Sequence, residues 1–152
     1  GCIVQSEIYD TFLATGGPEY MLEFAHGYTY SAHPIACAAG NAVLELLQQE
    51  QAPERVQALA PVLERAVHGL HNAPHVLDIR NFGLAAGLSI APWPGEPARR
   101  PYEVAMKCWE KGFYVRYGGD TLQLAPPFIS TEAEIESLVS ALGDALVETA
   151  RS

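Results

Sequence analysis

Residues 26–40 read HGYTYSAHPIACAAG and join a hydroxyl-rich turn to a helix of small residues. Gly27 lets the backbone come close to a ligand, and the hydroxyls of Thr29 and Ser31 can donate hydrogen bonds to an anionic group. Pro34 has the φ angle of a first helical turn, where its missing N–H costs little. The stretch therefore predicts an anion-binding loop followed by a helix that packs closely against a neighbour.

The apolar pattern outside this loop alternates between helical and strand spacing. It predicts helices over Glu7–Leu13 with Ser6 as N-cap, Pro34–Gln49, Pro53–His71, Pro101–Glu110, and from the capping box of Thr131 and Glu134 to Ala150. It predicts strands over Cys2–Gln5, His75–Asn81, Leu84–Ala91, Phe113–Tyr117 and Thr121–Ala125, with turns at Asn81-Phe82-Gly83 and Gly118-Gly119-Asp120. This order predicts an α/β fold, with an α+β small domain whose helices pack on a mostly antiparallel sheet.

Composition narrows the class of protein. The 152 residues carry a net charge of -9, and their nine basic residues are scattered apart from Arg99-Arg100. Nucleic acid is therefore not an expected partner, because phosphate binding needs a clustered basic face. The sequence contains no run of 18 apolar residues, so it predicts no membrane-spanning helix. The three cysteines are far apart and read as reduced thiols, which favours a cytoplasmic location.

The order H-G-Y-T-Y-S-A-H-P-x-A-C-A-A resembles a segment of the class III, pyridoxal-phosphate-dependent aminotransferases, which have fold type I. In that family the threonine of this loop holds the cofactor phosphate across the dimer interface. The resemblance implies that Thr29 and the neighbouring Tyr28 bind pyridoxal 5'-phosphate in a homodimer or higher homo-oligomer. A threonine in an isolated turn more often caps its own backbone. Here the phosphate role is favoured, because a phosphate needs several donors and close backbone approach.

Arg116 lies in a second motif, Y-V-R-Y-G-G-D-T-L-Q. An arginine on a strand before a tight Gly-Gly hairpin is suited to bidentate carboxylate recognition, although edge-strand charges usually face solvent. The motif is similar to the ω-amino acid:pyruvate (β-alanine–pyruvate) aminotransferases, in which the matching arginine binds the substrate α-carboxylate. The resemblance therefore implies that Arg116 binds substrate.

Lysine is scarce, and this limits what the chain can do. Aminotransferase chemistry needs a Schiff-base lysine, but the sequence holds only Lys107 and Lys111, both near the end of a predicted helix. In the family, the catalytic lysine lies upstream of the part that this chain resembles. We therefore expect no catalytic residue here, and a truncated, inactive C-terminal portion of a transaminase that uses an amine or ω-amino acid and pyruvate. The implied divisions are 1–32 (end of the large cofactor domain with the phosphate loop), 33–52 (linking helix) and 53–152 (C-terminal small domain).

Two alternatives remain open at this point. The first is a related class III enzyme, such as an aminomutase. The second is a non-catalytic domain for dimerisation or partner binding. Other side chains favour plain roles: His26 and His33 shape the loop, and Cys37 packs. His68, His71 and His75 lack the further ligand that a metal site needs.

Overall fold

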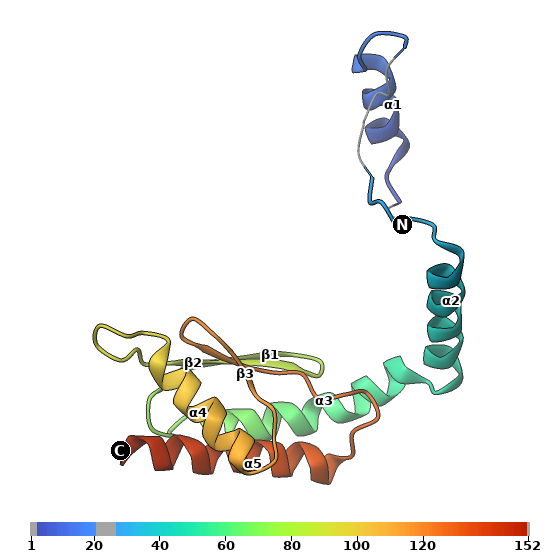
Figure 1. Cartoon of the computed structure of the whole chain (residues 1–152). Helices are drawn as coiled ribbons and strands as arrows, with labels where there is room; N and C mark the ends of the chain where they lie inside the picture. Colours follow the sequence, from blue (N-terminus) through green and yellow to red (C-terminus); the bar gives the residue numbers. More distant parts are fainter. Residues whose placement is uncertain (1–2, 21–26, 152) are drawn as a thin grey trace. The chain divides into compact units, whose positions relative to one another are not determined.

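The computed structural model describes residues 3–20 and 27–151. The chain divides into two compact units, residues 1–44 and residues 45–152. The first unit holds α1 (Ser6–Thr15) and most of α2 (Pro34–Gln49) (Figure 1). Among the described residues of α1 and α2, no side chain is buried. Apolar side chains such as Phe12, Ile35 and Val43 are exposed instead. The described residues of the first unit therefore form no hydrophobic core of their own.

The second unit is built on one sheet of four strands: β1 (Val76–Phe82), β2 (Ala85–Ile90), β3 (Arg116–Gly118) and β4 (Thr121–Leu124). Their spatial order is β1-β2-β4-β3, and every neighbouring pair is antiparallel. The helices α3 (Ala52–His68), α4 (Arg99–Glu110) and α5 (Glu132–Ala150) lie together against one face of this sheet (Figure 1). The predicted α/β fold with helices on an antiparallel sheet is confirmed.

The hydrophobic core lies between the sheet and the helices. Alternate residues of β2, namely Ala86, Leu88 and Ile90, are buried, because side chains of a strand point to opposite faces in turn. The helices contribute further fully buried side chains, among them Leu63 of α3 and Leu142 of α5. This continuous core makes the second unit the stable part of the described chain.

The opposite face of the sheet carries polar side chains in register. One row crosses all four strands, because Arg80 pairs with Gly87, Gly87 with Gln123, and Gln123 with Arg116. The Arg80 guanidinium donates to Asp78 Oδ2 at 2.9 Å and to Ser89 Oγ at 3.0 Å. Arg116 thus lies at the far edge of a polar sheet face, on β3.

The loops of the second unit differ from expectation in one hairpin. The β1–β2 turn is Gly83-Leu84, whereas the predicted turn Asn81-Phe82-Gly83 was wrong because Asn81 and Phe82 belong to β1. Gly83 has φ +54°, which glycine adopts at little cost. The predicted β3–β4 hairpin is present, but its turn is Gly119-Asp120 because Gly118 belongs to β3, and Gly119 has φ +59°.

Helix boundaries test the sequence signals further. The predicted bounds of α2 and the capping box of Thr131 and Glu134 at the start of α5 are confirmed. The helix predicted to reach His71 ends at His68, followed by Gly69. Ser6 is not an N-cap: Gln5 precedes α1, and its side chain makes no capping bond. Residues 3–5 are not a strand, and Cys2 lies outside the described residues.

Candidate functional site

Arg116 is held at the edge of the sheet by a short strand and a tight turn. Its backbone pairs with Gln123 of β4, and both side chains lie on the polar face of the sheet. Tyr117, the next residue, pairs with buried Leu122 and faces the helices instead. The hairpin at Gly119-Asp120 therefore fixes which way the guanidinium points.

A cleft of about 750 Å³ opens beside Arg116. Its lining includes Tyr114, Gln123, Pro126 and Glu134. Within the described residues, no hydrogen bond or ion pair engages the Arg116 side chain. The one acidic residue lining this cleft within the described residues, Glu134, already accepts hydrogen bonds from the Thr131 backbone N–H at 2.7 Å and the Thr131 hydroxyl at 2.9 Å. The Arg116 guanidinium is thus available for an added carboxylate.

Glu134 stays ionised in its place at the start of α5. The hydrogen bond from the Thr131 backbone, and then that from its side chain, lower the pKa of Glu134. The carboxylate is held by the capping box, where it also satisfies an unpaired donor of the helix end. The Glu134 carboxylate therefore serves the capping box at the start of α5.

Thr29 lies in a pair of overlapping turns just before α2. The Ser31 N–H donates to the Tyr28 carbonyl at 3.0 Å, and the His33 N–H donates to the Tyr30 carbonyl at 3.2 Å. Ala32 has φ +59°, so the chain bends sharply here. Thr29 is exposed, and no described residue hydrogen-bonds to its hydroxyl. The backbone N–H of Thr29 likewise donates to no described carbonyl. These free donors fit a phosphate ester.

Two histidines flank the loop, and Gly40 lies on the helix that follows it. The ring of His33 meets the ring of Tyr30 edge to face, with centroids 6.4 Å apart, which agrees with a role in shaping the loop. His26 lies outside the described residues. A Cβ added at Gly40 of α2 would meet nothing within 4 Å. The close packing predicted for this helix face is therefore not made by the described residues.

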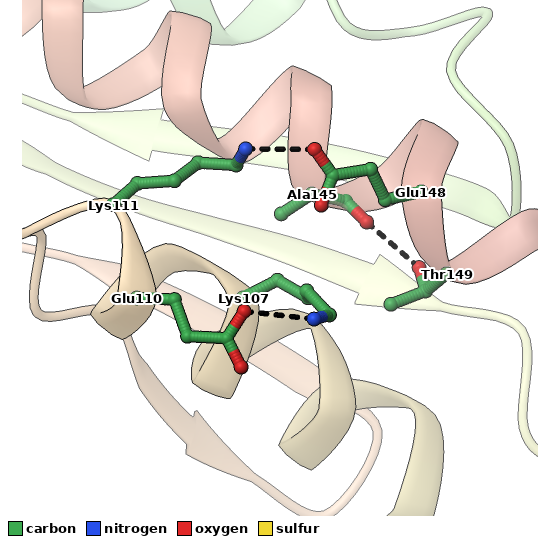
Figure 2. Close-up of polar contacts among 6 residues, drawn as sticks. All are labelled: Lys107, Glu110, Lys111, Ala145, Glu148 and Thr149. Atoms are coloured by element: carbon green, nitrogen blue, oxygen red, sulfur yellow. Dashed lines mark hydrogen bonds and ion pairs between the residues drawn. The ribbon is translucent and has the colours of Figure 1, made fainter.

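The two lysines are both engaged in ion pairs on the second unit. Lys107 Nζ lies 2.7 Å from Glu110 Oε2, and Lys111 Nζ lies 2.7 Å from Glu148 Oε1; Figure 2 marks both ion pairs with dashed lines. The side-chain hydrogen bond to the paired glutamate raises the pKa of each lysine. A lysine that attacks a carbonyl needs a neutral amine, which burial or a nearby cation favours by lowering the pKa. Lys107 and Lys111 instead have a raised pKa, which favours the charged ammonium form.

Among the described residues, the remaining titratable candidates do not assemble into a reactive group. His68 Nε2 lies 2.9 Å from Asn81 Oδ1, and His71 Nδ1 lies 3.0 Å from the His68 carbonyl. Among the residues that the structure describes, no cluster of three or more His, Cys, Asp or Glu could hold a metal ion. Burial raises the pKa of Cys108 to about 11, so this thiol is protonated.

Sequence motifs predicted Arg116 and Thr29 as site residues, and both stay predictions, whereas Gln123, which lines the same cleft as Arg116, was not predicted. The signal was present, since a two-residue turn at Gly119-Asp120 sets Gly118 opposite Thr121 and Arg116 opposite Gln123. Thr29 and Arg116 belong to different compact units.

The chain belongs to the class III aminotransferase family. Residues 1–146 match the sequence model of that family, "Aminotransferase class-III". The chain is 52% identical over 144 residues to a beta-alanine–pyruvate aminotransferase of Pseudomonas aeruginosa and, over the same length, to an omega-amino acid–pyruvate aminotransferase of Pseudomonas putida. In both cases 95% of this chain and 32% of the relative are covered.

The fold is shared with solved aminotransferases. The structure of an adenosylmethionine-8-amino-7-oxononanoate aminotransferase from Methanocaldococcus jannaschii matches with a TM-score of 0.79 at 32% identity, covering 93% of this chain and 33% of that one. The chain thus spans about a third of the length of the relatives it matches. A further solved structure that it matches is a PMP-bound aminotransferase from Vibrio fluvialis, with a TM-score of 0.75 at 27% identity, covering 85% of this chain and 30% of that one. In the described part of the chain, no helix combines the length and apolar character needed to cross a bilayer.

Proposed function

We propose that this chain is the C-terminal portion of a transaminase that moves an amino group from an amine or ω-amino acid to pyruvate. The observation that carries the proposal is Arg116, whose guanidinium has no partner among the described residues and lies beside a cleft of about 750 Å³. A planar guanidinium donates two parallel N–H bonds to one carboxylate, which both pyruvate and an ω-amino acid possess. Arg116 binds and orients that group.

The phosphate loop supplies the second part of the proposal. The Thr29 hydroxyl and backbone N–H are free donors that hold the phosphate of pyridoxal 5'-phosphate, with Tyr28 beside them. When bound, this cofactor supplies an electron sink for the pair left when the substrate C–H bond breaks. The residues of this chain contribute binding and orientation, and the amine that takes part in the chemistry comes from elsewhere in the enzyme.

A homodimer completes the phosphate site in this proposal. The exposed small and apolar side chains of α2, including Ile35 and Val43, support packing against a second copy. In that arrangement Thr29 serves the cofactor of the neighbouring subunit. The enzyme works in the cytoplasm, where its cysteines stay reduced.

The isolated chain is expected to be inactive. Incubated with pyridoxal phosphate, an amine donor and pyruvate, it should form alanine no faster than cofactor and substrates without protein. The reason is that Lys107 and Lys111 are the only lysines, and both are held as ammonium groups by glutamates. Alanine is measured by chromatography over time. Turnover that disappears in Lys107→Ala or Lys111→Ala would contradict the assignment.

In the full-length enzyme, Thr29→Val is expected to weaken cofactor binding. The change removes one hydroxyl donor to a phosphate and keeps the side-chain shape, so the dissociation constant of the cofactor should rise roughly 10- to 100-fold. It is measured by the absorbance of the bound cofactor on titration of the cofactor-free protein. Thr29→Ser, which keeps the hydroxyl, is the matched control and should stay near wild type. Equal affinity of Thr29→Val and wild type would remove the role of Thr29.

A further inference from the structure

Two aromatic pairs join α4 to the segment that carries Arg116. The rings of Tyr102 and Tyr117 have centroids 5.6 Å apart at an interplanar angle of 75°, and those of Trp109 and Tyr114 are 6.4 Å apart at 83°. Both are edge-to-face geometries, in which the positive edge of one ring meets the negative face of the other. Tyr102 and Trp109 are seven residues apart on α4, so they lie on the same face of the helix.

These pairs bracket Arg116 along the chain. Tyr114 is two residues before it and Tyr117 is the next residue after it. The strand between them, β3, has three residues and pairs on one side only, with β4. So short an edge strand has few backbone hydrogen bonds to hold it. Side-chain contacts therefore help to hold this segment, both those of buried Val115 with the core and those of the tyrosines with α4.

The aromatic pairs act on the backbone and not on the guanidinium. Tyr117 pairs with Leu122 on the helical face of the sheet, whereas Arg116 pairs with Gln123 on the polar face. The Tyr117 ring thus lies on the opposite side of the strand from the Arg116 side chain, whereas Tyr114 lines the same cleft as Arg116. The two tyrosines remain partly exposed, with 41% of Tyr117 and 73% of Tyr114 accessible. They are less buried than the core residues, so we expect them to contribute less to the stability of the whole unit than the core does.

We propose that the ring pair of Tyr102 and Tyr117 fixes the position of Arg116 relative to the substrate carboxylate, so that both tyrosines are positioning residues. The pair of Trp109 and Tyr114 supports them. This inference rests on the proposed function of Arg116. Loss of one edge-to-face pair lets β3 shift. The Arg116 guanidinium then donates its two hydrogen bonds to the carboxylate in the required geometry for a smaller fraction of the time. The expected loss in carboxylate recognition is roughly 2- to 10-fold for one pair.

The experiment compares Tyr117→Leu and Tyr102→Leu with the conservative Tyr117→Phe and Tyr102→Phe in the full-length enzyme. The leucine variants should lower kcat/KM for pyruvate roughly 2- to 10-fold, and should lower it far less for an amine donor without a carboxylate. The phenylalanine variants keep the ring pair and should restore the pyruvate value. An equal fall for both substrates would mean a general structural defect and would overturn the proposal.

A double-substitution test separates this inference from the function on which it rests. If Tyr117 acts through Arg116, then Tyr117→Leu should lower kcat/KM for pyruvate in the wild-type background but not in an Arg116→Ala background. A loss of the same size in both backgrounds would overturn the positioning role while leaving Arg116 as the carboxylate residue. If Arg116→Ala itself leaves pyruvate kinetics unchanged, the proposed function fails instead.

A readout on the chain itself does not depend on catalysis. Hydrogen exchange at the backbone amides of β3 should be faster in Tyr117→Leu than in Tyr117→Phe, while exchange at Leu88 and Leu142 in the core stays slow. Unchanged protection of β3 in Tyr117→Leu would show that the ring pair does not hold the strand, and would contradict the inference without any assay of activity.

Discussion

Replacing Arg116 by alanine in the full-length enzyme is expected to lower kcat/KM for pyruvate about 100-fold or more. The guanidinium can donate two charge-assisted hydrogen bonds to one carboxylate, each contributing about 1.5–3 kcal/mol. No acidic side chain among the described residues occupies it, so the whole of this interaction is available to the substrate. The measurement is steady-state kinetics with pyruvate varied at a fixed amine concentration.

A second arginine on the same sheet face provides the matched control. Arg80 shares the cross-strand row with Arg116, but its guanidinium already donates to Asp78 and Ser89. Arg80→Ala should therefore leave pyruvate kinetics close to wild type. Arg116→Lys should recover only part of the loss, because an ammonium keeps the charge without the planar pair of donors. Similar losses in Arg80→Ala and Arg116→Ala would mean that the charge of the face matters and that Arg116 has no specific role.

Sequence signals were most successful where a local interaction fixes the structure. Pro34 sets the start of α2, and the reciprocal bonds of Thr131 and Glu134 set the start of α5, so both could be predicted without knowing the tertiary contacts. The first hairpin was misplaced because Leu84 is apolar and buried, although it occupies the turn. Its side chain reaches the core from the turn, and this tertiary contact leaves no local signature.

The sequence motifs predicted roles for Thr29 and Arg116, and these roles stay predictions. The surroundings of Arg116 could not be predicted and needed the structure. That Glu134 lines the cleft of Arg116 yet stays bound to its own cap depends on how α5 packs beside the sheet. The state of the two lysines also needed the structure, because Lys111 pairs with Glu148 on a different helix, 37 residues away in sequence. Such long-range pairs follow from packing and not from spacing.

Leu142→Ala is expected to lower the free energy of unfolding of this chain by about 2–5 kcal/mol. Leu142 is fully buried in α5, within the core that α3, α4, α5 and the sheet share. Removing its side chain loses apolar burial and leaves a cavity that the surrounding helices fill only in part. The change is measured by denaturant unfolding followed by circular dichroism, with the midpoint shifted and the slope unchanged.

The same substitution at Leu44 is the control that locates the folding unit. Leu44 lies on α2 with 65% of its side chain accessible, and no residue of α2 is buried within the described chain. Leu44→Ala should therefore change the free energy of unfolding by no more than about 0.5 kcal/mol. If instead Leu44→Ala is as damaging as Leu142→Ala, then α2 packs in solution, and the cooperative core extends into the first unit. If Leu142→Ala is harmless, the core between sheet and helices does not hold this chain together. The contrast between two identical chemical changes makes burial, and not the loss of leucine itself, the cause under test.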